Sequence, residues 1–305
     1  MKQIIKLIIV LVAMASVSAE AGMIARANAV PQGIPSGIAL GGPGTVNGTN
    51  MGQPNLPGSI PQGAPGPGGK TNVGQRDIID TVEQSYRALN TLIADFFQRS
   101  TLAKERREMR ADGQMFLKAA NDREPLKFRF NYFRPTNHEI VSNGRSLWTY
   151  LPENRKVLLS DVSFVFDPMR FNPDRDRASN FLQGLGRISK DFMITSPPQG
   201  QDVDGNYILE LEPRRATETI QKLFIVVNRD AVLQYVWNNR DIRKIINDPQ
   251  RPEWTFPILS TTVVDHQGNT TIMEFSNLKA NAAISDQTFE FMIPGGVDVV
   301  RPSPR

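Results

Sequence analysis

Strand-forming segments fill most of the chain after residue 105, and turn signals separate them about every ten residues. Strands and helices do not alternate along this part of the chain, which argues against a doubly wound parallel sheet. The sequence therefore predicts one antiparallel sheet or barrel in meander order. The predicted strands lie in residues 108–120, 125–133, 141–150, 155–164, 206–213, 220–237, 260–275 and 288–294.

Several of these strands carry large apolar side chains on both faces. In residues 141–150 an Asn-Gly pair at 143–144 favours a tight type I′ turn, after which Trp148 and Tyr150 share one side of a strand. Leu147 and Leu151 share the other side. An antiparallel sheet with one face in water alternates apolar with polar residues. The second apolar face therefore needs a cover, either an ordinary core layer or an apolar ligand, and the pattern leaves both open.

Three segments have helical features. In residues 77–99, apolar residues recur at helical spacing, and Asp77 is the expected N-cap. In residues 174–185 a short helix is expected to carry Phe181, Leu182 and Leu185 on one side. Residues 238–260 mix charge, proline and apolar side chains, and we expect a helical turn and a loop at the edge of the sheet.

The first 74 residues are expected to lie outside the folded domain. Residues 1–21 have the basic start, apolar centre and small-residue cleavage site of a secretory signal peptide. Residues 22–74 are rich in Gly and Pro and have too few apolar side chains to form a core, so we expect them to be disordered. The folded domain is then residues 75–305. The chain has no cysteine that could carry a lipid anchor, which predicts a soluble periplasmic protein.

Catalytic and cofactor motifs are absent from the sequence. Its two histidines, His138 and His266, are far apart, and no nucleophile elbow, phosphate loop or zinc-binding motif occurs. We therefore expect no enzyme activity, no metal and no cofactor. The net charge is +4, but the basic residues are scattered, and export makes nucleic acid an improbable partner.

Several segments together resemble the LolA family, the periplasmic carriers of outer-membrane lipoproteins. They include LIADFFQRS (92–100), EIVSNGRSLWTYLPENRKV (139–157), FLQGLGRISKDF (181–192) and residues 264–300. Each motif is weak alone, but their order and number over residues 77–301 make the resemblance fairly specific. The family has an Asp-Phe-x-Gln motif at the end of its first helix, a Gly-containing strand, and then Ser-Asp-Gly-x-x-Leu-Trp-x-Tyr.

The resemblance implies an α+β fold, mainly β, with an incomplete antiparallel β-barrel and a helical lid over an apolar concave face. It also implies lipoprotein acyl chains as ligand, an inner-membrane ABC transporter that loads the carrier, an outer-membrane receptor that unloads it, and a monomer. The candidate lipid-binding residues are Phe128, Phe130, Trp148 and Tyr150 in the wall and Phe181, Leu182 and Leu185 in the lid.

One position departs from the family pattern. The family has an arginine before a proline, thought to tie the lid to the sheet, whereas here Glu124 precedes Pro125 and Arg123 lies one residue earlier. Arg123 is the candidate latch, or the latch is absent. Two other functions stay open: a carrier or sensor of another envelope lipid or glycolipid, and an envelope hydrolase with carboxylate chemistry.

Overall fold

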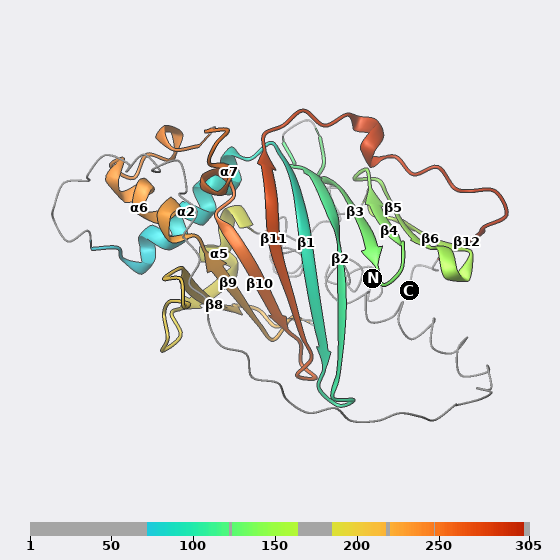
Figure 1. Cartoon of the computed structure of the whole chain (residues 1–305), viewed down its shortest axis with the longest axis horizontal. Helices are drawn as coiled ribbons and strands as arrows, with labels where there is room; N and C mark the ends of the chain where they lie inside the picture. Colours follow the sequence, from blue (N-terminus) through green and yellow to red (C-terminus); the bar gives the residue numbers. More distant parts are fainter. Residues whose placement is uncertain (1–71, 122–123, 164–184, 218–219, 247, 302–305) are drawn as a thin grey trace, which may run out of the picture.

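The computed structural model describes residues 72–121, 124–163, 185–217, 220–246 and 248–301 (Figure 1). The strands are β1 (Thr91–Leu102), β2 (Arg107–Lys118), β3 (Lys127–Arg134), β4 (Glu139–Ser142), β5 (Ser146–Leu151), β6 (Lys156–Asp161), β7 (Phe192–Thr195), β8 (Tyr207–Pro213), β9 (Lys222–Val227), β10 (Ile258–Val264), β11 (Thr270–Ala280) and β12 (Asp298–Val300). The α-helices are α2 (Gln75–Ala88), α5 (Ile188–Asp191), α6 (Arg229–Trp237) and α7 (Pro252–Thr255). The 3-10 helices are η1 (Pro152–Asn154), η3 (Leu185–Arg187), η4 (Ile242–Lys244) and η5 (Asp286–Phe289).

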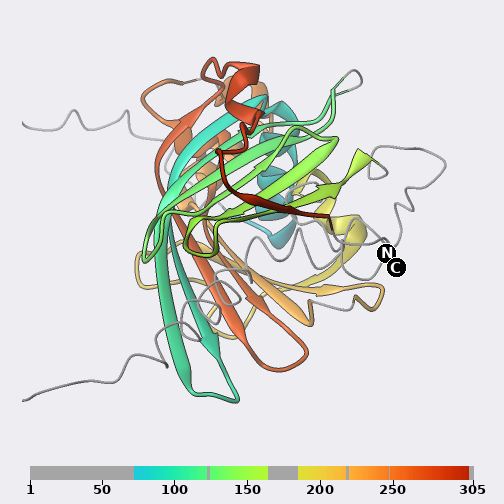
Figure 2. The same cartoon turned by 90° about the vertical axis from the view of Figure 1, so that its right-hand side faces the viewer.

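Within the described residues, the strands form one sheet in the order β12-β6-β5-β4-β3-β2-β1-β11-β10-β9-β8-β7. Every neighbouring pair is antiparallel except β12 and β6. The sheet curves strongly around α2, and among the described strands it does not close, because β12 and β7 are its two edges (Figure 2). The predicted fold class, an incomplete antiparallel barrel with helices on its concave side, is therefore confirmed.

The first helix is shorter than the sequence pattern suggests. α2 ends at Ala88, and residues 91–99, which we expected to continue the helix, belong to β1. Strand pairing decides the outcome, since β1 lies between β2 and β11 in the middle of the sheet. Asp77 does not occupy the N-cap; its carboxylate accepts a hydrogen bond from the backbone N–H of Gly74 at 3.0 Å from within the first turn.

Two predicted strands differ from the structure, one in part and one as a whole. The strand expected over residues 220–237 ends at Val227, because the Asn228 side chain accepts a hydrogen bond from the N–H of Ala231 and starts α6. Residues 288–294 form the end of η5 and irregular backbone instead of a strand.

The predicted turn at 143–144 is present, but its type I′ geometry is not. Gly144 has a φ of 87°, whereas Asn143 does not have the positive φ that type I′ requires. The Asn143 side chain instead accepts hydrogen bonds from the N–H groups of Arg145 and Ser146, at 3.0 and 2.9 Å. A side-chain-stabilised loop therefore joins β4 to β5.

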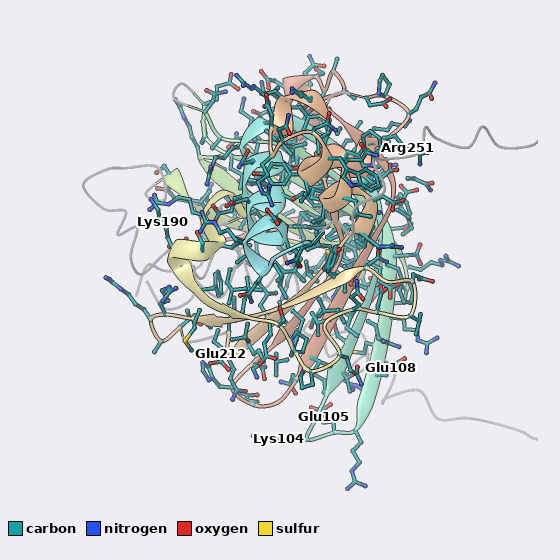
Figure 3. All side chains as sticks on the ribbon, turned by 90° about the vertical axis from the view of Figure 1, so that its left-hand side faces the viewer. Lys104, Glu105, Glu108, Lys190, Glu212 and Arg251 are labelled. Atoms are coloured by element: carbon teal, nitrogen blue, oxygen red, sulfur yellow. The ribbon has the colours of Figure 1, made fainter. Side chains whose placement is uncertain are left out.

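The helices form a second layer on the concave side of the sheet. Ile78, Ile79 and Val82 of α2 belong to the same buried apolar cluster as the inner side chains of the strands. The helical turn expected in residues 238–260 is confirmed by η4 and α7, but both contact α2 and do not form a loop at the sheet's edge. Figure 3 shows Arg251 in this helical layer and Lys104 and Glu105 at the opposite end of the molecule, at the tip of the β1–β2 hairpin.

Candidate functional site

The inner face of the sheet is apolar over most of β1, β2 and β3. Strand register places Leu117 opposite Phe128 and Met115 opposite Phe130, so these four side chains point to the same face. All four are buried. The expectation that Phe128 and Phe130 share one face is therefore confirmed, and that face is the concave one, which also holds α2.

A glycine in β2 makes room for the aromatic side chains of this face. The Phe96 ring packs edge-on against Tyr132 at 4.9 Å and lies 5.7 Å from the ring of Phe130. A Cβ atom at Gly113 would lie 2.7 Å from the Phe96 ring and 2.1 Å from the backbone oxygen of Asn131. Only glycine fits here without movement of a neighbouring strand.

Trp148 and Tyr150 lie on the opposite, convex face, so their placement with Phe128 and Phe130 in one wall is wrong. The register pairs Phe128 with Ser142 and Ser142 with Leu147, which brings Leu147 to the inner face and Trp148 to the outer one. The alternation of side chains within β5 is predicted correctly. Which of its two faces points inward depends on the register from β3 through β4 to β5, and alternation within one strand does not determine that register.

The C-terminal segment, residues 281–301, covers this convex face. Phe291 lies 6.4 Å from the Trp148 ring and 5.6 Å from the Tyr150 ring. Asp286 pairs with Lys118 and Lys127 at 3.0 and 3.1 Å. Figure 2 shows the segment crossing β3 to β6 on its way to β12. The second apolar face of β5 is thus covered by the chain itself.

The proposed lid residues are only partly within the described structure. Leu185 is fully buried in η3 and joins the main apolar cluster. Phe181 and Leu182 lie outside the described residues, as does the candidate latch Arg123. Glu124, which occupies the position before the proline, pairs with Lys118 at 2.8 Å. The Lys118 ammonium lowers the pKa of this carboxyl.

Polar contacts join α2 to two other parts of the helical layer. One is α6 with the residues that follow it, and the other is α5. Arg240 donates to both carboxylate oxygens of Asp77, at 2.6 and 3.2 Å, and this hydrogen bonding lowers the pKa of Asp77. Gln84 donates to the Tyr235 hydroxyl at 2.7 Å. On the other side, Glu83 accepts from the N–H of Ser189 at 2.8 Å. The 238–260 insertion therefore supplies one clamp on α2 that the sequence did not indicate.

His138, to which the sequence alone assigns no role, is buried on the inner face of the sheet. Its ring stacks on Tyr132 at 4.0 Å on the inner face, and its side chain is 3% exposed. Burial lowers the pKa of His138 to about 4, since the charged imidazolium is poorly solvated there. The imidazole is therefore neutral at pH 7.

This burial predicts a pH-dependent stability. Between pH 6.5 and about 4 the unfolded chain binds a proton at His138 that the folded chain does not, so the free energy of unfolding falls as the pH falls. We expect wild type to lose about 2 kcal/mol between pH 7 and pH 5 relative to His138→Gln. Urea denaturation at both pH values measures the difference. His266→Gln, at an exposed position, is the control and should follow wild type; a parallel pH dependence in His138→Gln would contradict the expectation.

The part of the chain that the structure describes contains no cluster of three His, Cys, Asp or Glu side chains suited to a metal ion. Among the same residues, no helix has the length and apolar character needed to cross a bilayer.

Sequence comparison matches the chain to outer-membrane lipoprotein carriers. The family model described as "Outer membrane lipoprotein carrier protein LolA" matches residues 87–238. An outer-membrane lipoprotein carrier protein of Methylobacillus flagellatus is 22% identical over 224 residues, which cover 73% of this chain and 89% of that protein. The carrier protein of Bordetella avium is 26% identical over 205 residues, covering 67% and 78%. Among solved structures, a LolA superfamily protein from Nitrosomonas europaea aligns with 72% of this chain and 99% of its own, at 14% identity and a TM-score of 0.34.

Proposed function

Because the chain belongs to the LolA family, we propose that it is a non-enzymatic carrier that binds the acyl chains of lipoproteins and moves them from the inner to the outer membrane. The observation that carries this proposal is the inner face of an unclosed sheet, which is apolar over most of β1, β2 and β3. A face of this kind suits a flexible hydrocarbon chain.

The energetics of an acyl anchor explain why such a face is needed. Each buried CH₂ contributes about 0.8 kcal/mol, so a multiply acylated protein does not cross water unassisted. Phe128 and Phe130 are the proposed contacts, with Leu185 and, outside the described residues, Phe181 and Leu182 as lid contacts. Arg123 remains the proposed latch. Trp148 and Tyr150 are left out of the proposed site because they pack on Phe291.

The proposed route follows from the family. After export through a cleaved signal peptide, the monomeric carrier accepts lipoproteins from an inner-membrane ABC transporter in the periplasm. It then passes them to a receptor at the outer membrane. The clamp between Asp77 and Arg240 holds α2 on the inner face, so loading requires α2 to make way for the acyl chains.

Photo-crosslinking from β3 tests the binding face. A photoreactive phenylalanine analogue at Phe130 points inward, whereas the same analogue at Phe133, which is 52% exposed, points outward from the same strand. After incubation with inner-membrane vesicles that contain acylated lipoproteins, we expect a crosslinked lipoprotein from position 130 and none from position 133. Equal crosslinking from both positions would contradict the proposal.

Purification from the native periplasm distinguishes the lipoprotein carrier from the two other functions. Mass spectrometry of the isolated protein should find lipoproteins bound one-to-one. Free glycolipid in their place would favour a lipid carrier or sensor. An empty protein that also extracts no lipoprotein from vesicles would rule the carrier out, and turnover of an envelope substrate would favour the hydrolase.

A further inference from the structure

A polar cluster interrupts the apolar inner face near the β1–β2 hairpin. It consists of five side chains from β1, β3, β11 and the residue before β4: Gln98, Ser100, Tyr132, His138 and Thr271. Register places them on the same face, because Ser100 lies opposite Thr271, and the backbone N–H of Tyr132 donates to the carbonyl of His138. All five are buried.

Hydrogen bonds link four members of the polar cluster. The Tyr132 hydroxyl donates to Gln98 Oε1 at 2.9 Å, and Gln98 Nε2 donates to the Ser100 hydroxyl at 3.2 Å. The hydroxyls of Ser100 and Thr271 are 3.2 Å apart. Buried polar groups are costly in an apolar environment even when they are partly satisfied, so a chain that needed only a core here would be more stable with apolar residues.

His138 supplies the unsatisfied atom of the polar cluster. Its Nδ1 lies 3.3 Å from the Thr136 hydroxyl, but its Nε2 is buried and has no hydrogen-bond partner among the described residues. Leaving such an atom unpaired costs about 1–3 kcal/mol. A ligand group that reaches Nε2 would recover this free energy.

We propose that the polar cluster is a subsite for one uncharged hydrogen-bonding group, a hydroxyl or a carbonyl, of an acylated ligand whose chains lie along the apolar part of the inner face. The inference rests on the proposed lipid-carrier function. It adds the direction in which the bound ligand lies, with its polar group at the polar cluster. The five side chains include no carboxylate, lysine or arginine, and burial keeps His138 neutral at pH 7, so a phosphate or carboxylate gains no counter-charge here. The bond that links an acyl chain to the rest of the ligand has an uncharged carbonyl group, which matches this requirement.

Binding of three probes with the same alkyl chain tests the subsite. Dodecane has no polar group, 1-dodecanol offers a hydroxyl, and methyl dodecanoate offers a carbonyl; each is measured by displacement of a fluorescent apolar dye. His138→Phe keeps a ring that can stack on Tyr132 but removes Nε2. We expect it to weaken binding of the alcohol, the ester or both about fivefold to tenfold while dodecane binding is unchanged, since one hydrogen bond is lost. Loss confined to the alcohol identifies a hydroxyl ligand, and loss confined to the ester identifies a carbonyl.

A second pair of variants tests the subsite independently of whether His138→Phe folds. Thr271→Val removes one hydroxyl of the polar cluster with little change in shape, and Thr270→Val makes the same substitution on the other face of β11. Only Thr271→Val should weaken the polar probes. If wild type binds all three probes and neither His138→Phe nor Thr271→Val changes their relative affinities, the subsite proposal is contradicted. The proposed carrier function is then unaffected. If wild type binds none of the probes, both the subsite and the carrier are wrong.

Discussion

Gly113→Ala is expected to lower the free energy of unfolding by about 3 kcal/mol, at the upper end of the cost of overpacking a core. The added Cβ would lie 2.1 Å from the Asn131 carbonyl oxygen and 2.7 Å from Cζ of Phe96. The first of these atoms belongs to the backbone of β3, so relief requires β2 and β3 to move apart. The second belongs to a ring that is itself held edge-on against Tyr132.

Urea denaturation followed by tryptophan fluorescence measures this effect. Gly295→Ala is the matched control, because a Cβ there would have no other heavy atom within 4 Å. It should unfold at the wild-type urea concentration. Equal midpoints for the two variants would mean that β2 and β3 tolerate the displacement and that Gly113 does not shape the aromatic part of the inner face.

The antiparallel sheet could be predicted because its signal is local. Alternation within a strand and turn residues between strands are both visible in short stretches, as in the Asn-Gly loop and the two-sided β5. The first helix was extended too far because Leu89, Ile93 and Phe96 fit helical spacing, while Leu92, Ala94 and Phe96 fit alternation equally well. Pairing with β11, about 180 residues away along the chain, decides between the two.

The candidate site could be predicted only within single strands. Phe128 and Phe130 were grouped correctly because they are two residues apart in β3. Whether Trp148 joins them depends on the register through β4, where a shift of one residue would reverse the answer. The polar cluster was missed because its members come from separate parts of the chain and each looks ordinary alone.

Phe289→Ala should have the other large effect on stability, since removal of a fully buried aromatic side chain costs about 3–5 kcal/mol. Phe289 ends η5, between the contacts of Asp286 with Lys118 and Lys127 and the contact of Phe291 with Trp148. Its loss should loosen the whole C-terminal segment from the convex face. We therefore expect a lower urea midpoint and faster amide hydrogen exchange in β12, the part of this segment that pairs with β6.

Met292→Ala provides the comparison, because Met292 lies in the same segment but is 90% exposed. It should leave both the midpoint and the exchange rates at the wild-type values. If Phe289→Ala lowers the midpoint without faster exchange in β12, the segment is held by its ion pairs and by Phe291, and Phe289 stabilises the fold without anchoring β12. If both measurements change together, the convex face of β3 to β6 depends on Phe289 for its cover. In that case the two apolar faces of β5 are covered in different ways, the inner face by the core that includes α2 and the outer face by the chain's own C-terminal segment.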